Sequence, residues 1–306
     1  KLNTQAYKVG DLLNNATIGA ISSNIEFKGK GTSLKSADLV LSGKVSEAFY
    51  EGKKYQNIVF SGDLKNQIFD TKLTVNDPSA GFSWAGIIDL SKPNLELNGT
   101  SKLDFVNLQK LGITKENIVV RGNIDLKNIV LDPKSPFIDF QGKNINVYKD
   151  DVLFPIGDVK VITSTKDGNN KLEATTSFIN LSLSGDFDYS KLQNIMLNEV
   201  NNYFKLLNFK PALVQDSYNF RLDGKVSYNP VFSAFLPALK SFSDVVVHAT
   251  LQSEGDIPIE GNVQIPYLQY DSIKVYNTNF DYSGDRKALK YQLLTKQITN
   301  NDLRVR

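Results

Sequence analysis

The stretch Ile118-Val119-Val120-Arg121-Gly122-Asn123-Ile124-Asp125-Leu126 alternates apolar and polar side chains, with Val119 as the one exception among the polar positions. A period of two is typical of a β-strand that has one apolar face and one polar face. Gly122 stands in the apolar row of this stretch, where a strand usually packs a larger side chain.

The same construction recurs along the chain, each time with a glycine in the apolar row. A glycine inside a strand indicates a bend, a bulge or the close approach of another group. If such glycines line up across neighbouring strands, they form a crease along which a sheet can fold over. The residues of this predicted crease are Gly43, Gly62, Gly86, Gly99, Gly122, Gly185, Gly224 and Gly261.

We therefore predict an all-β-dominated fold, an elongated and curled antiparallel repeat sheet that encloses an apolar groove, with a few short amphipathic helices. Turn signals such as Asp167-Gly168, Asp77-Pro78 and Lys92-Pro93 favour hairpins between successive strands. An ordinary β-sandwich with bulges at the glycines is the alternative. The apolar rows give the predicted groove lining, which is Leu41, Phe60, Phe82, Trp84, Ile88, Leu95, Leu97, Ile118, Val120, Ile124, Leu181, Leu183, Phe220, Leu222, Ile259 and Val263.

Three segments depart from the period of two. Residues 104–111, closed by Gly112, have helical spacing and predict a short helix. Residues 190–208 predict a longer amphipathic helix with Ser190 as its N-cap. A third helix is predicted over about 230–242, with Asn229 as its cap and a kink at Pro237. The expected organisation is a groove repeat over 1–189, continued over 190–306 with two helical insertions.

Composition excludes several classes of function. The net charge of +2 provides no field that would attract nucleic acid. The chain has no cysteine and a single histidine, His248, so thiolate chemistry and multi-histidine metal sites are excluded. No apolar run reaches the roughly 20 residues that a membrane-spanning helix needs. The chain begins with Lys1 and shows no signal sequence, which we interpret as an internal fragment of a longer protein.

The sequence also lacks a catalytic constellation, and we predict no enzyme activity, no cofactor and no metal. Ser83 lies in a Gly-Phe-Ser-Trp-Ala sequence that resembles a nucleophile elbow, but Ala85 replaces the second glycine. His248 is predicted to be solvated or hydrogen-bonded on the polar side of a strand.

Some of these residues carry a resemblance to a known family. The stretch from Phe49 to Gly62, the segments 69–73 and 76–78, and Gly86-Ile87-Ile88-Asp89-Leu90 resemble the repeats of TamB-type proteins of the AsmA-like group, especially the very large ones of Bacteroidota. Residues 103–113 resemble the recurring sheet-to-short-helix element of that family, and residues 122–126 resemble its strands. The helices expected after residue 190 depart from its simplest continuous groove.

The resemblance implies a β-taco fold within an inner-membrane-anchored protein that spans the periplasm. It implies a role in moving phospholipids toward the outer membrane and in outer-membrane biogenesis, with a TamA-like outer-membrane barrel as partner. The inner-membrane anchor would precede the present chain. Catalytic residues are not part of the resemblance.

An apolar trough accounts for such a role, because acyl chains bind by buried area without directed hydrogen bonds. Two alternatives remain at this level. One is a dry periplasmic scaffold or interaction module that assists outer-membrane protein assembly. The other is a fragment of a transmembrane barrel, which also has alternating strands of about ten residues.

Overall fold

The computed structural model describes residues 1–306 except 9, 12–14, 133, 206–209, 213–216, 286, 301–302 and 306, and only the backbone of 303–305. The chain divides into two compact units. The first unit contains Lys1–Leu131 and Asp139–Asp158, and the second contains Asp132–Ile138 and Val159–Arg306. The division therefore lies between residues 131 and 159, whereas the sequence analysis placed a boundary at residue 190.

The first unit is a sheet of antiparallel strands that pair in chain order from β1 to β8. Its strands are β1 (Leu2–Lys8), β2 (Ile18–Lys30), β3 (Asp38–Tyr50), β4 (Lys53–Lys65), β5 (Ile68–Asn76), β6 (Ala80–Asp89), β7 (Leu95–Asn107) and β8 (Ile118–Leu131), followed by most of β9 (Phe137–Lys149) and the first part of β10 (Val152–Lys166).

The second unit continues with antiparallel strands and holds both described helices. Its elements are the end of β10, β11 (Asn169–Thr175), β12 (Ile179–Asp186), α2 (Leu192–Tyr203), β13 (Asn219–Val226), α3 (Pro230–Phe235), β14 (Leu239–Phe242), β15 (Val245–Gln252), β16 (Ile259–Tyr270), β17 (Ile273–Gly284), β18 (Leu289–Asn300) and β19 (Leu303–Val305). The short β14 pairs with β16, beyond the segment of β16 that pairs with β15.

Several hairpins close through two residues with positive φ, as type I′ turns require. These pairs are Glu51-Gly52, Asn66-Gln67, Asp150-Asp151 and Asp167-Gly168. Such turns match the twist of the flanking strands, so each hairpin keeps its register. The turn predicted at Asp167-Gly168 is confirmed, and the paired carboxylates of Asp150 and Asp151 belong to a turn between β9 and β10.

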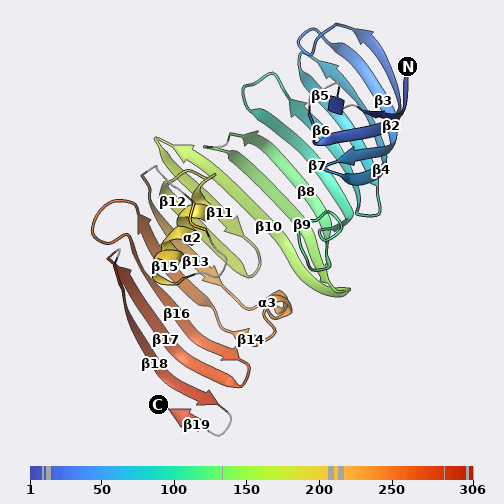
Figure 1. Cartoon of the computed structure of the whole chain (residues 1–306). Helices are drawn as coiled ribbons and strands as arrows, with labels where there is room; N and C mark the ends of the chain where they lie inside the picture. The colour runs from blue at the N-terminus through green and yellow to red at the C-terminus, as the bar shows by residue number, and fades with distance from the viewer. Residues whose placement is uncertain are drawn as a thin grey trace. The chain divides into compact units, whose positions relative to one another are not determined.

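The predicted all-β-dominated, curled antiparallel sheet is confirmed. In each unit the described strands pair edge to edge into one antiparallel sheet, and they do not divide into the two separate sheets of a sandwich. Figure 1 shows the strands of the first unit curling along their length.

The helix predicted over residues 104–111 is wrong. β7 extends as far as Asn107, and residues 108–110 form a turn. The amide of Leu111 donates to the carbonyl of Asn107, and Gly112 takes a positive φ of 72°. The apolar spacing that suggested a helix arises because the strand ends in a tight turn of similar local curvature.

The helix predicted over 190–208 forms as α2, over Leu192–Tyr203. Residues 206–208 of the prediction lie outside the described residues. Ser190 is not its N-cap; Lys191 holds that position without a side-chain hydrogen bond. Ser190 instead donates its amide and its hydroxyl to Asp188 Oδ1, at 2.8 and 2.6 Å. An aspartate two residues upstream competes for this hydroxyl, so the serine closes a turn before the helix.

The third predicted helix begins as expected but is shorter than predicted. Asn229 Oδ1 accepts a hydrogen bond from the amide of Val231 at 2.9 Å, and Pro230 occupies the first turn. α3 ends at Phe235, and residues 239–242 form β14. Pro237 thus ends the helix, because a proline disfavours helical geometry at the residue before it. Neither described helix is long and apolar enough to cross a membrane.

Candidate functional site

The strand register of the first unit brings many of the predicted lining residues together. Phe60, Leu73, Trp84, Ser101 and Ile124 stand opposite one another across β4, β5, β6, β7 and β8. We call this set the central rung. Facing residues in such a set lie close enough for their side chains to pack. The central rung is thus a nearly unbroken apolar line across five strands.

A second line of facing residues runs parallel to the central rung. It joins Phe69, Ile88, Leu97 and Ile129 across β5, β6, β7 and β8. Phe82 stands opposite Leu103 and starts a third line of this kind. Together these lines form one surface of the sheet, which we call the apolar face of the first unit. Its predicted members are Leu41, Phe60, Phe82, Trp84, Ile88, Leu95, Leu97, Ile118, Val120 and Ile124.

Most of these side chains are only partly buried. Ile118 is the one predicted lining residue of this unit that is buried, with 8% of its surface exposed. The adjacent residues in each strand, which point to the other side of the sheet, are more exposed. Ile87 next to Ile88 and Val59 next to Phe60 are examples. The apolar face is therefore distinguished from the polar face, and most of its side chains keep partial contact with solvent.

The predicted crease is partly formed. Gly62, Gly86 and Gly99 lie on one line across β4 to β7, with the buried Thr71 of β5 between the first two. Gly43 and Gly122 fall on neighbouring lines, because Gly43 faces Phe60 and Gly122 faces Leu103. In the second unit Gly185, Gly224 and Gly261 face Phe220, Leu181 and Tyr282, and they do not form a line.

Each of these glycines leaves room for a large neighbouring side chain. A Cβ atom at Gly43 would lie 2.9 Å from the Phe60 ring, and one at Gly99 would lie 2.7 Å from the Trp84 indole. The same close approach occurs at the others, between Gly62 and Phe69, Gly86 and Trp84, Gly122 and Ile145, Gly185 and Phe220, Gly224 and Leu181, and Gly261 and Tyr282. Aromatic rings and branched side chains therefore pack over the glycines, which is a known way to stabilise a glycine within a strand.

Trp84 occupies the middle of this arrangement. Its ring lies against both Gly86 and Gly99. Its indole Nε1 is buried and has no hydrogen-bond acceptor among the described residues. A buried donor without a partner is unfavourable, so packing against the glycines must outweigh this cost.

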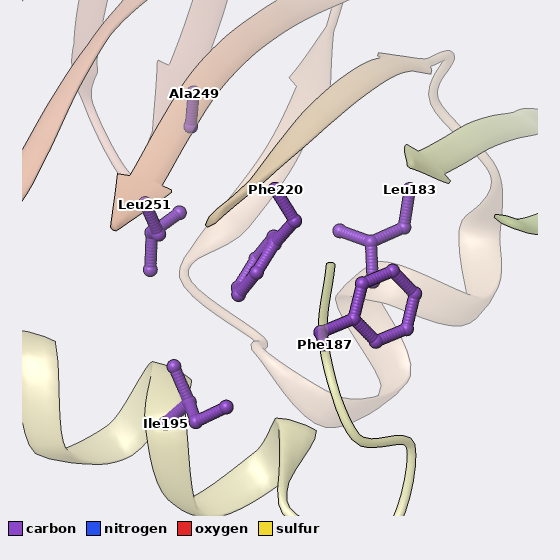
Figure 2. Packing of buried hydrophobic residues seen from close by; sticks show 6 residues of the cluster. All are labelled: Leu183, Phe187, Ile195, Phe220, Ala249 and Leu251. Atoms are coloured by element: carbon purple, nitrogen blue, oxygen red, sulfur yellow. The ribbon is translucent and has the colours of Figure 1, made fainter. Parts of the chain in front are cut away.

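The apolar face of the second unit has a different environment, because α2 packs on it. Leu183, Phe187, Phe220, Ala249 and Leu251 of the sheet region form a buried cluster with Ile195 of α2. Figure 2 shows Ile195 pointing from the helix toward Phe220 and Leu251. Two predicted lining residues, Leu183 and Phe220, are thus core residues, with 4% and 1% of their surface exposed. The others in this unit, Leu181, Leu222, Ile259 and Val263, are partly buried.

A polar contact also fixes α2. Glu199 is buried, and its Oε1 accepts a hydrogen bond from the hydroxyl of Tyr218 at 2.6 Å. Asn198 Nδ2 donates to the carbonyl of Ala212 at 2.7 Å. The helix is thus held to the segment that precedes β13 by hydrogen bonds as well as by apolar packing.

The polar face shows no assembled nucleophile. Ser83 faces Thr74 and Lys102 across the sheet, which supplies no general base. His248 is hydrogen-bonded, as predicted, with its Nδ1 2.6 Å from Asp223 Oδ1. Arg221 donates to the same oxygen from Nε and Nη2. The hydrogen bond from Arg221, and then that from His248, hold the pKa of the Asp223 carboxyl below its ordinary value. No hydroxyl nucleophile completes this cluster in the hydrogen bonds described.

In the part of the chain that the structure describes, no group of three or more histidine, aspartate or glutamate side chains could hold a metal ion. Comparison with family models, with curated proteins and with solved structures found no match for this chain. The candidate site is therefore defined by its own geometry, the partly exposed apolar face of the first unit.

Sequence reasoning missed two features. The first is that α2 packs on the apolar face of the second unit. A helical period predicts an amphipathic helix, but it does not predict which surface the helix packs against. The second is a hollow on the polar face of the first unit. Neither feature had a signal in the sequence, because both depend on which residues the register and the packing of α2 bring together.

Proposed function

We propose that the apolar face of the first unit binds the acyl chains of phospholipids. The observation that supports this proposal is the set of apolar lines across β4 to β8 in which most side chains remain partly exposed to solvent. Apolar surface left in contact with water costs about 25 cal/mol per Å², so a flexible hydrocarbon chain gains free energy by covering it.

The chemistry of the surface suits acyl chains better than a polar ligand. Its side chains are leucine, isoleucine, valine, phenylalanine and tryptophan, which offer contact area and almost no directed hydrogen bonds. Equivalent lines along the sheet give a bound chain several similar positions, so it can slide between them in small steps. Head groups would remain at the edge of the face, in water.

α2 limits this proposal to the first unit. In the second unit the part of the equivalent surface around Leu183 and Phe220 is covered by Ile195 and the residues around it. Acyl chains would reach that surface only if α2 moved away. The second unit therefore offers acyl chains, in this proposal, less accessible apolar surface than the first unit does.

The cellular role that we propose follows from the resemblance to TamB-type proteins. The chain would be a segment of a periplasmic protein, anchored in the inner membrane by a part outside this sequence. It would carry phospholipid toward the outer membrane together with a TamA-like barrel partner. A dry scaffold that assists outer-membrane protein assembly is the competing function.

The two neighbouring isoleucines of β6 provide a matched test. Ile88 belongs to the apolar face, whereas Ile87 is 43% exposed on the other side of the same strand. The wild-type chain, Ile88→Asp and Ile87→Asp would be purified from bacteria without detergent, and bound phospholipid would be measured by native mass spectrometry and lipid extraction. We expect Ile88→Asp to lose the lipid and Ile87→Asp to retain it.

A second pair of variants controls for a folding defect at one position. Phe60→Asp should behave as Ile88→Asp does, and Val59→Asp, on the exposed side of β4, should behave as the wild type does. Circular dichroism would verify that each variant is folded. A folded wild-type chain that carries no phospholipid and takes up no fluorescent lipid would refute the proposal and favour the scaffold.

A further inference from the structure

The polar face of the first unit carries a hollow that the acyl-chain proposal does not use. Its volume is about 510 Å³, and it extends over β5, β6, β7, β8 and β9. Pockets of this size are typical of small-molecule sites. Most of its lining residues have the phase opposite to the central rung, so the sheet itself separates the hollow from the apolar face.

Cations dominate the charge of this hollow. Lys72 of β5, Lys102 of β7 and Lys143 of β9 line it, against a single carboxylate, Asp125. Lys102 Nζ lies 2.9 Å from Asp104, and Asp125 is itself 3.5 Å from Lys127. Within the described residues, Lys72 and Lys143 form no ion pair. The hollow thus holds two ammonium groups whose charge no neighbouring carboxylate neutralises.

Neutral hydroxyls stand between these lysines. Thr74 faces Ser83, Ser83 faces Lys102, and Thr100 lies on the adjacent line of the same face. The three hydroxyls of Thr74, Ser83 and Thr100 form no hydrogen bond with other described residues. A hydroxyl both donates and accepts, which is what the hydroxyl groups of a saccharide require of a binding surface.

The spacing of the strands sets the length of the ligand. β5 and β9 are four strand positions apart, and neighbouring strands lie about 4.8 Å from one another. Lys72 and Lys143 therefore come from strands about 19 Å apart, a separation that a sugar with a phosphate at each end spans better than a single phosphate does. We propose that this hollow binds a saccharide that carries two phosphate groups, with Lys72 and Lys143 at the phosphates and the hydroxyls of Thr74, Ser83 and Thr100 at the sugar.

Calorimetric titration of the whole chain would test this site. The probes are fructose 1,6-bisphosphate, glucose 1-phosphate and fructose, and phosphatidylcholine vesicles with and without phosphatidylglycerol. We expect saturable binding of the bisphosphate, weaker binding of the monophosphate and none of fructose. The double variant Lys72→Gln/Lys143→Gln should weaken binding of the bisphosphate by about tenfold or more, since each charge-assisted contact contributes on the order of 1 kcal/mol.

The control replaces two lysines that lie on the polar face outside the hollow. Lys28→Gln/Lys44→Gln removes the same charge from β2 and β3 and should leave the affinity within about twofold, because neither lysine lines the hollow and salt screens exposed charges. Equal weakening in both double variants would mean a general charge effect and would overturn the proposal. Absence of saturable binding to the bisphosphate, or equal binding of fructose, would also overturn it.

The vesicle arm separates a lipid head group from a free sugar phosphate. Binding to phosphatidylglycerol vesicles that the Lys72→Gln/Lys143→Gln variant loses, together with bisphosphate binding, would make the head-group phosphates of two neighbouring lipids the natural source of the same chemistry. Bisphosphate binding without vesicle binding would identify a soluble ligand. Ile88→Asp should not change either result, so this site and the acyl-chain surface can fail independently.

Discussion

The two units present the same strand pattern to different environments. In the first unit, most side chains of the apolar face stay partly exposed. In the second unit, α2 covers the corresponding surface and turns part of it into a dry core around Phe220. The comparison shows that an apolar row in a strand does not by itself make a binding surface or a core. The presence of a helix decides which of the two it becomes.

The largest effect is expected where the difference in burial is largest. Phe220 is 1% exposed in the second unit, whereas Phe60 is partly buried in the first. Phe220→Ala should lower the free energy of unfolding by about 3–5 kcal/mol, because it removes a buried ring and leaves a cavity. Phe60→Ala should lower it by less than half as much. Urea unfolding followed by circular dichroism measures both, and equal losses would mean that the first apolar face is as well covered as the second.

The attachment of α2 should be the next most sensitive feature. Glu199→Ala removes a buried carboxylate that accepts from the Tyr218 hydroxyl and should cost about 1–3 kcal/mol of unfolding free energy, since this hydrogen bond holds α2 to the segment before β13. Met196→Ala, on the exposed side of the same helix, should change it by less than about 0.5 kcal/mol. If the lipid surface is limited by α2, Glu199→Ala should also increase the amount of co-purified phospholipid. An unchanged amount of co-purified phospholipid would mean that α2 does not limit lipid binding.

The packing of a ring over a glycine can be tested in the first unit alone. Gly99→Ala places a methyl group 2.7 Å from the Trp84 ring and should destabilise the unit by about 1–3 kcal/mol through overpacking. Trp84 is the only tryptophan of the chain, so its fluorescence reports directly on this unit. Thr100→Ala, at the neighbouring exposed position, should leave both the emission and the stability nearly unchanged. A wild-type spectrum in Gly99→Ala would show that the ring does not depend on the glycine.

The smallest effect concerns acid stability in the second unit. The pKa of Asp223 is lowered by the hydrogen bond from Arg221 and then by that from His248, so the carboxylate favours the folded state. A lowered folded pKa gives a contribution that is present above the ordinary value of 3.8 and is lost as the pH falls below it. Asp223→Asn should therefore lower the stability slightly near neutral pH and not near about pH 2. The cluster is largely exposed to solvent, which keeps the change small. Thermal melts across this range would measure it, and a pH-independent difference would assign the effect to packing.

Several predictions from the sequence failed for local reasons. The helix predicted over 104–111 was wrong because a strand that ends in a tight turn can reproduce helical spacing over a few residues. Serine is a frequent N-cap residue, yet the hydroxyl of Ser190 donates to Asp188 instead of capping α2. The end of α3 at Phe235 follows from Pro237, whose effect the sequence indicated only as a kink. In each case a neighbour within a few residues decided between two conformations of similar local free energy.

The sequence alone determined the strands, the polar and apolar sides of each strand, and the places where glycine interrupts the apolar rows. These depend on side-chain period and on residue type, which act within one strand. Only the tertiary structure decided that Gly62, Gly86 and Gly99 align while the other glycines do not, because alignment depends on the register between strands. It also decided that Ile195 covers Phe220 and that Lys72 and Lys143 border one hollow. Such contacts join residues far apart in the chain, and their free energy depends on shape complementarity that no local pattern encodes.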